Sequence, residues 1–192
     1  SPPKRENKPR EENALSVEDI TSTTVDGKKA FKNINFLIKQ GEIVGIAGVE
    51  GNGQRELAES ILGVFPIEKG KITLNDQEIN LLNTRERREF GISFIPEDRQ
   101  SQGLLMDVSL SENMILGRQS TSAYKSKYSN IIYSQANQDS QLVIENYDVR
   151  TPGNKTLALA LSGGNQQKFV VGRELEDNPK LLIASQPTRG ID

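Results

Sequence analysis

The sequence predicts an α/β fold with a mostly parallel core sheet. Three observations support this class. Short apolar runs typical of buried strands recur along the chain, segments of helical pattern separate them, and glycines cluster between one such strand and the next helix. The 192 residues suffice for one domain with a buried core. No apolar run approaches the roughly 20 residues that a membrane-spanning helix needs.

The first ninety residues predict an antiparallel and a parallel portion. Three prolines and many charges among the first twelve residues are typical of a linker. After them we expect strands at 15–20, 31–38 and 43–47, a helix that ends at Gly63, a strand pair within 71–79 that turns at Asn75 and Asp76, and a short helix at 84–89.

The second half predicts helices between two buried strands. Ser109 with Glu112 three residues later forms a capping box at a helix start. The other expected elements are a strand at 91–95 that Pro96 stops, a loop at 119–129, helices at 132–147 and 163–175, and a strand at 180–184.

A glycine-rich loop follows the strand predicted at 43–47. Its glycines stand as in the phosphate-binding pattern G-x-x-G-x-G-K-[ST], in which backbone N–H groups cradle phosphate, the lysine reaches the β- and γ-phosphates and the hydroxyl ligates Mg²⁺. Gln54 occupies the lysine position and Arg55 the hydroxyl position. We therefore expect ATP to bind weakly or not at all here. The residues predicted to line this nucleotide site are Gly48, Val49, Glu50, Gly51, Asn52, Gly53, Gln54, Arg55 and Glu56.

A second motif, L-S-G-G-N-Q-Q-K at 161–168, opens the helix predicted at 163–175. Ser162 and two glycines at a helix start expose a hydroxyl and bare N–H groups to an anion. A simple helix cap needs no pair of glycines, because glycine weakens a helix. The motif therefore predicts an anion contact.

With this motif the chain resembles the ATP-binding subunits of ABC transporters, and the sequence L-S-G-G-N-Q-Q-K is typical of importers for sugars and nucleosides. The resemblance runs from about residue 15 to Asp192. In that family one polypeptide carries two ATPase domains in tandem, and the chain is identified as the second. This implies an interdomain linker at 1–13 and a P-loop NTPase domain at 14–192, with an antiparallel β subdomain and a helical subdomain at about 98–160. Because residues 189–192, including Asp192, match the family's D-loop, we expect a fragment that lacks the C-terminal part.

Two further segments resemble family landmarks. Residues 91–99 (G-I-S-F-I-P-E-D-R) place Glu97 where most ABC domains have the Q-loop glutamine. Residues 181–188 resemble the Walker B stretch, which normally ends in D-E-P-T. Ser185 replaces the aspartate that supports Mg²⁺, and Gln186 replaces the glutamate that polarises the attacking water. The resemblance thus implies no catalytic residue and no metal at this domain's own site.

The motif at 161–168 is the one called the signature motif in ABC transporters. The resemblance implies that it acts on another domain, because in ABC dimers the signature of one domain closes over the P-loop of the other. We expect Mg²⁺ only at that partner site. The expected partners are the N-terminal ABC domain of the same polypeptide, membrane permease subunits and an extracellular or periplasmic substrate-binding protein, with the protein peripheral on the cytoplasmic face of the membrane. The signature residues expected to complete the partner's ATP site are Leu161, Ser162, Gly163, Gly164, Asn165 and Gln166.

Smaller differences in sequence bear on the cargo of the expected importer and on the alternative functions. Residues 47–54 are more like the nucleoside importers, whereas sugar-type second domains usually keep D-E-P-T-R-G; a monosaccharide importer stays the alternative. An independently active ATPase would need substitute Mg²⁺ ligands. A tandem ABC protein without membrane subunits, such as a translation factor, is disfavoured by the net charge of -2 and the lack of a long basic block, which also speak against nucleic-acid binding. The chain has no cysteine and no histidine, which excludes disulfides and histidine acid–base catalysis.

Overall fold

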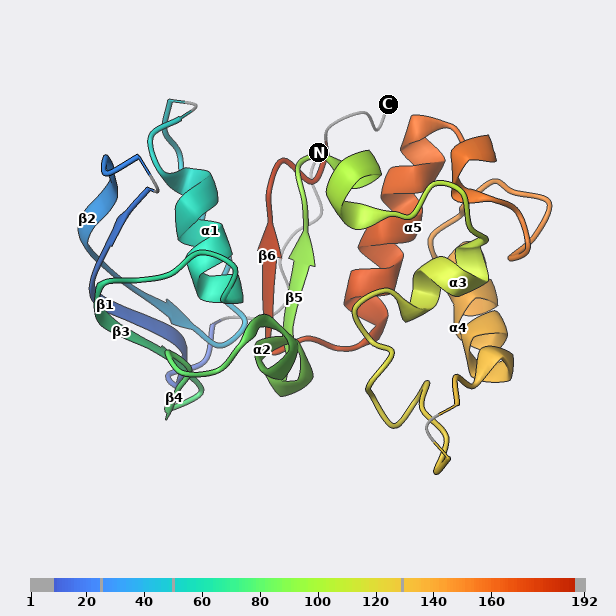
Figure 1. Cartoon of the computed structure of the whole chain (residues 1–192), viewed down its shortest axis with the longest axis horizontal. Helices are drawn as coiled ribbons and strands as arrows, with labels where there is room; N and C mark the ends of the chain where they lie inside the picture. The colour runs from blue at the N-terminus through green and yellow to red at the C-terminus, as the bar shows by residue number, and fades with distance from the viewer. Residues whose placement is uncertain (1–8, 25, 50, 129, 189–192) are drawn as a thin grey trace. The chain divides into compact units, whose positions relative to one another are not determined.

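The chain divides into two compact parts, Ser1–Phe90 and Gly91–Asp192 (Figure 1). The computed structural model describes residues 9–24, 26–49, 51–128 and 130–188. The first part holds an antiparallel sheet with two helices, and the second holds a short parallel sheet with the remaining helices. The mixed α/β class is therefore confirmed.

The sheet of the first part contains four strands in the order β2-β1-β3-β4. These are β1 (Asn13–Thr23), β2 (Lys29–Lys39), β3 (Lys69–Leu74) and β4 (Gln77–Glu78). Alternate residues of β1 point into the core: Leu15 lies opposite Leu74 of β3 and Val17 opposite Ile72, and all four are buried. The predicted turn is confirmed as a two-residue hairpin loop at Asn75 and Asp76, with φ of 45° and 62°, as a type I′ turn requires.

Two helices accompany this sheet, α1 (Gln54–Leu62) and α2 (Thr84–Phe90). Helix α1 ends at Gly63, which caps it in the left-handed conformation with φ of 78°. The buried Arg87 of α2 donates from Nη1 to the carbonyl oxygens of Ser60 and Ile61, 2.7 and 3.0 Å away. These bonds supplement the hydrogen bonding of the carbonyls in the last turn of α1, where Ser60 O also accepts from the backbone N–H of Gly63 at 3.1 Å.

The second part is built on the parallel strands β5 (Ile92–Ile95) and β6 (Leu181–Ala184). Its helices are the π-helix η1 (Arg99–Gly103), α3 (Leu110–Ile115), α4 (Tyr133–Asn146), the 3₁₀ turn η2 (Ala158–Ala160) and α5 (Gly163–Glu176). Phe169 and Val170 of α5 are fully buried in an apolar core with Leu110, Met114 and Val143 from α3 and α4. This core fixes α5, whose first turn carries the signature motif.

Helix α3 begins as the sequence predicts. The Ser109 side chain accepts from the backbone N–H of Glu112, and the Glu112 carboxylate accepts from the backbone N–H of Ser109 at 2.9 Å. The Glu112 carboxylate also accepts from the Ser109 hydroxyl at 2.5 Å, and the hydrogen bonds from this hydroxyl and from the Ser109 backbone N–H lower the pKa of Glu112. The capping box is therefore confirmed.

The expected strand at 43–47 is wrong. Residues 42–49 form no helix or strand, and the side chains of Ile43 and Ile46 are 83% and 57% exposed. An apolar run becomes a parallel strand only where a neighbouring strand accepts its backbone hydrogen bonds, and none of the described strands pairs with residues 43–47. The parallel sheet of the described residues consequently has two strands. No helix among these residues combines the length and apolar character needed to cross a bilayer.

Candidate functional site

The glycine loop leads directly into α1. Gly53 occupies the N-cap position with φ of 89°, and no side chain caps the helix there. A Cβ at this position would lie 2.3 Å from the carbonyl oxygen of Ala30, so only glycine fits. Gly51 also has a positive φ, of 85°. Gly51 and Gly53 therefore adopt left-handed backbone conformations directly before the start of α1.

The side chain of Gln54 folds back over this loop. Its Nε2 donates to the carbonyl oxygen of Val49 at 3.0 Å, and a Cβ on Gly48 would lie 2.0 Å from that nitrogen. The Gln54 amide thus occupies the loop, and Gln54 stands at the sequence position where the phosphate-binding pattern has a lysine. Asn52 is exposed beside it, and Glu50 lies outside the described residues.

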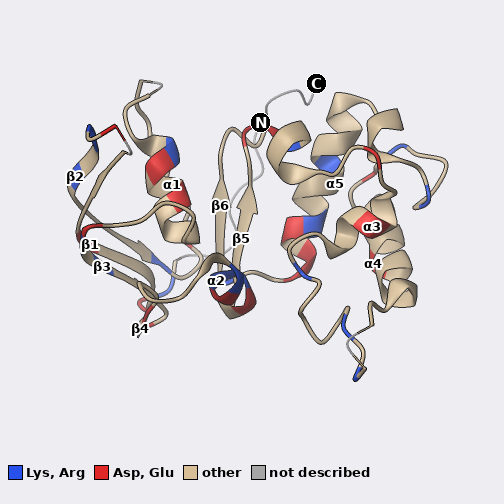
Figure 2. Ribbon diagram, viewed as in Figure 1, with Lys and Arg blue, Asp and Glu red and all other residues tan. Residues whose placement is uncertain are grey.

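The charge of Arg55 is directed along the helix. Its Nε lies 2.7 Å from Oε1 of Glu59, an i,i+4 ion pair on α1, a helix on which Figure 2 shows both basic and acidic residues. Glu56 in the same turn adds a half-buried acidic residue. The cation that replaces the P-loop hydroxyl therefore pairs with a carboxylate of its own helix.

Ser162, the second residue of the signature motif, is the N-cap of α5. Its exposed hydroxyl oxygen accepts from the backbone N–H of Asn165 at 3.5 Å and from Nδ2 of the same residue at 2.9 Å. The backbone N–H of Arg150 donates to Oδ1 of Asn165 at 2.9 Å. The serine is thus held at the helix start with its side chain toward solvent.

The two signature glycines continue this exposed edge. Both are half-buried, and Leu161 before them is buried in the apolar core. A Cβ on Gly163 would lie 2.5 Å from Nη2 of Arg99, which follows β5 in η1. The bare backbone at Gly163 therefore leaves room for a guanidinium beside the start of α5.

Gln166 of the signature motif is a buried residue. Its side chain is 2% exposed, and its Nε2 donates to the carbonyl oxygens of Ala158 and Leu161 at 3.1 and 3.2 Å. Its Oε1 accepts from Nε2 of Gln100 at 3.1 Å. Gln166 thus supports the motif from inside, because its amide completes hydrogen bonds to the surrounding loops. Its expected contact with a nucleotide in trans stays a prediction.

The last two motif residues also bind other segments. Gln167 is buried and donates to the carbonyl oxygen of Pro187 at 2.9 Å, which joins α5 to the segment after β6. Lys168 contacts both the backbone oxygen and a carboxylate oxygen of Asp148 at 2.9 Å. This hydrogen bond from Lys168 lowers the pKa of Asp148. The motif is therefore a structural junction as well as an exposed edge.

The segments after β5 and β6 carry the remaining candidates. Glu97 is half-buried, and the neighbouring Asp98 caps η1 by accepting from the backbone N–H of Gln100 at 3.0 Å. The backbone N–H of Ser185 donates to Ile95 O at 2.9 Å, and Gln186 is exposed with φ of 49°. Asp192 lies outside the described residues.

This donor set does not fit Mg²⁺. In proteins Mg²⁺ is bound mainly through carboxylates, and Ser185 and Gln186 supply none. Within the described ranges no group of three histidine, cysteine, aspartate or glutamate side chains could hold a metal ion. Ser185 and Gln186 therefore offer a metal ion no carboxylate ligand at this segment.

Residues 31–189 match the family model described as ABC transporter. The chain belongs to the ABC transporter family. It is 45% identical over 185 residues to the guanosine import ATP-binding protein NupO of Bacillus subtilis, covering 93% of this chain and 35% of that protein. It is 38% identical over 181 residues to the nucleoside import ATP-binding protein NupA of Lactococcus lactis subsp. cremoris, covering 93% and 35%. The galactose/methyl galactoside import ATP-binding protein MglA of Escherichia coli is 35% identical over 190 residues, covering 99% and 36%.

This ABC domain thus spans about a third of the length of the curated relatives it matches. Among solved structures, the ATP-binding cassette MJ0796 bound to ADP and Pi superposes with a TM-score of 0.75 at 23% identity, covering 93% of this chain and 76% of that one. A nucleotide-free ATP-binding cassette gives 0.76 at 22% identity, covering 93% and 71%. These likenesses confirm the P-loop NTPase fold of ABC cassettes.

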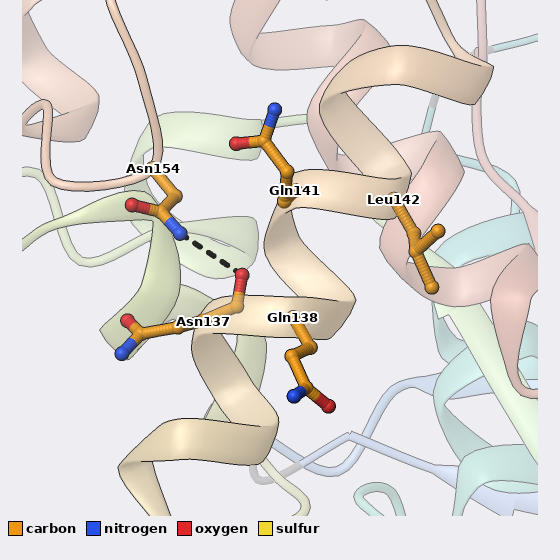
Figure 3. Close-up of a pocket in the computed structure, with 5 residues that line it drawn as sticks. All are labelled: Asn137, Gln138, Gln141, Leu142 and Asn154. Carbon is orange, nitrogen blue, oxygen red and sulfur yellow. Dashed lines mark hydrogen bonds between the residues drawn. The ribbon is translucent and has the colours of Figure 1, made fainter.

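A pocket of about 470 Å³ in this ABC domain contains none of the motif residues. It lies on α4 and is lined by Asn137, Gln138, Gln141, Leu142 and Asn154 (Figure 3). Asn154 Nδ2 donates to Asn137 O at 2.9 Å across it. The lining offers amides but no titratable group.

Sequence reasoning missed three contributors to the signature region. These are Arg99, Gln100 and the backbone of Arg150. The polar run after Pro96 gives a local signal for the Asp98 cap, but nothing in the sequence pairs Arg150 with Asn165. Such pairs form only when the loops fold together.

Proposed function

We propose that this ABC domain is a non-hydrolysing half of an importer's ATP-binding subunit, whose signature motif completes the ATP site of a second ABC domain in the same polypeptide. The observation that carries this proposal is a contrast within the chain. The Ser162 hydroxyl is exposed at the start of α5, whereas Gln54 fills the domain's own glycine loop. An exposed hydroxyl and N–H groups suit the charge that develops on a transferred phosphoryl group.

The domain's own site is proposed to bind ATP weakly or not at all. Arg55 is paired with Glu59, and Ser185 and Gln186 provide no carboxylate for Mg²⁺ or for water activation. Phosphoryl transfer depends on positioning and charge stabilisation, so hydrolysis here should be negligible. Mg²⁺ is accordingly assigned to the partner domain's site.

Nucleosides are the proposed cargo. The relatives at 45% and 38% identity are named for guanosine and nucleoside import, whereas the galactose and ribose import proteins lie at 35% to 37%. Monosaccharide import is the second candidate, supported by the galactose and ribose import proteins. In either case the proposed assembly includes membrane permease subunits and a substrate-binding protein, with this domain on the cytoplasmic face.

The test is steady-state ATP turnover by the full-length polypeptide assembled with its permease. Ser162→Ala should lower kcat by about 10- to 100-fold, since a hydrogen bond to a charged group contributes about 1.5–3 kcal/mol. Ser134→Ala, at an exposed serine on α4, is the matched control and should leave kcat unchanged.

Two results would contradict the proposal. One is a Ser162→Ala enzyme with the kcat of the parent. The other is turnover on the order of 1 s⁻¹ by this domain alone in Mg-ATP, a rate typical of competent phosphoryl-transfer sites. The second result would favour the independently active ATPase.

A further inference from the structure

The side chain of Asn165 limits the hydrogen bonds that the Ser162 hydroxyl can make. A hydroxyl has one proton to donate and two lone pairs that accept. Both contacts within the chain use the oxygen as acceptor, because the backbone N–H and the Nδ2 group of Asn165 can only donate. The hydroxyl proton is therefore left to donate outward.

The orientation of the Asn165 amide is itself fixed. The backbone N–H of Arg150 can only donate, so the atom facing it must be Oδ1, and the observed distance is 2.9 Å. Nδ2 then faces Ser162. A flipped amide would bring two donors together at Arg150 and two acceptors together at Ser162.

The position of Arg150 follows from the end of α4. The chain turns at Asp148, which has φ of 50°, and the backbone N–H of Val149 bonds to the carbonyl oxygen of Ile144 at 3.0 Å. Lys168 of α5 holds the same turn through Asp148 at 2.9 Å. These bonds therefore hold the turn after α4 against the first two turns of α5.

We infer that Asn165 is a positioning residue that presents the Ser162 hydroxyl as a donor to an anion, the terminal phosphate of a nucleotide held by another domain. The chain of donors runs from Arg150 N–H through the Asn165 amide to the Ser162 O–H. This inference rests on the proposed function, since it names how the signature serine is prepared for its partner's phosphate.

Asn165→Asp and Asn165→Ala separate this role from a structural one. A carboxylate still accepts from Arg150 N–H, but it cannot donate to Ser162, so the hydroxyl turns its proton inward. Alanine loses both contacts but leaves the hydroxyl free to rotate among three staggered positions, which costs about threefold in the productive one. A structural role predicts the opposite order, because an acidic residue in the first turn stabilises a helix.

The experiment measures kcat and KM for ATP with the full-length polypeptide and its permease. We expect Asn165→Asp to lower kcat by at least tenfold and Asn165→Ala by about threefold, with smaller changes in KM. The double variant Ser162→Ala/Asn165→Asp controls for charge repulsion: with no hydroxyl to misdirect, the added aspartate should lower kcat only slightly below that of Ser162→Ala. Thermal unfolding of each variant checks that it is folded.

The outcomes distinguish a failure of the proposed function from a failure of the inference about Asn165. If Ser162→Ala leaves kcat unchanged, the proposed function fails. If Ser162→Ala is impaired but Asn165→Ala is as slow as Asn165→Asp or slower, the inference is overturned and the proposed function stands. It is also overturned if Asn165→Asp is equally damaging with and without the Ser162 hydroxyl.

Discussion

The side-chain amide of Gln54 donates to the carbonyl oxygen of Val49, 3.0 Å away, across the glycine loop. The same nitrogen would lie 2.0 Å from a Cβ on Gly48. The loop that would receive phosphate is therefore closed by a residue of the helix that follows it. In place of the lysine's charge, it contains a neutral amide that is already hydrogen-bonded.

Restoring the two lost side chains should restore affinity but not hydrolysis. Gln54→Lys/Arg55→Ser replaces the amide with a cation and supplies a hydroxyl. We expect ATP to bind at least about tenfold more tightly, since one charge-assisted hydrogen bond contributes about 1.5–3 kcal/mol. Turnover should stay negligible because Ser185 and Gln186 are unchanged. Calorimetric titration with ATP, with and without Mg²⁺, measures the affinity.

The control for that variant is Arg85→Ser. Arg85 makes the same i,i+4 pair with Glu89 on α2 at 3.0 Å, and its replacement should not affect nucleotide binding. Micromolar, Mg²⁺-dependent binding of ATP by the parent chain would contradict the interpretation that Gln54 closes the glycine loop.

Gly53 and Gly51 should respond differently to alanine. Both have a positive φ, so either substitution costs about 1–2 kcal/mol of backbone strain. A Cβ at Gly53 also meets Ala30 O at 2.3 Å, whereas one at Gly51 meets nothing within 4 Å. Denaturant unfolding should therefore show Gly53→Ala to be the more destabilising, and equal losses would argue against close packing of the loop on β2.

Arg118 and Asp177 form an asymmetric ion pair of 2.8 Å, with side chains 2% and 49% exposed. Asp177→Ala leaves a buried guanidinium uncompensated, and we expect it to cost about 2–3 kcal/mol of unfolding free energy. Arg118→Met should cost only about 1 kcal/mol, because the stem still packs and the carboxylate left behind reaches water. Unfolding curves of the two variants test this order, and a larger loss for Arg118→Met would refute it.

Tyr124 should not titrate in the usual range. Burial, with a hydrogen bond to Asp139 Oδ2 at 2.7 Å, raises the pKa of Tyr124 well above its ordinary 10.0. Because the folded pKa is the higher one, the stabilising contribution is full below pH 10.0 and is lost as the pH rises through the folded value. Alkaline absorbance titration should change little near pH 10 in Tyr124→Phe, because the buried phenol of the parent protein is still protonated there. A titration step lost near pH 10 in this variant would be inconsistent with a buried phenol.

Local elements could be predicted because their causes lie within a few residues. The Ser109–Glu112 capping box, the turn at Asn75 and Asp76 and the helix end at Gly63 all form as expected. The strand at 43–47 could not be decided in this way. An apolar run has the same appearance whether or not a neighbouring strand accepts its hydrogen bonds.

In the candidate site, too, the sequence predicts features with a local cause but not those that depend on contacts between distant segments. The motif predicts that Ser162 is exposed at a helix start, since an N-cap hydroxyl acts within its own turn. It does not predict that Gln166 is interior or that Gln167 reaches Pro187, because these amides bond to carbonyls brought near only by folding.

The sequence by itself determined the α/β class, the caps and turns, and the two motifs by which the family is recognised. Only the tertiary structure decided that Gln54 closes the glycine loop, that Asn165 lies between Arg150 and Ser162, and that Gln166 is buried. The physical reason is that a polar side chain makes whichever hydrogen bonds the folded chain brings within reach. For Asn165 the partner lies fifteen residues away, in the turn after α4.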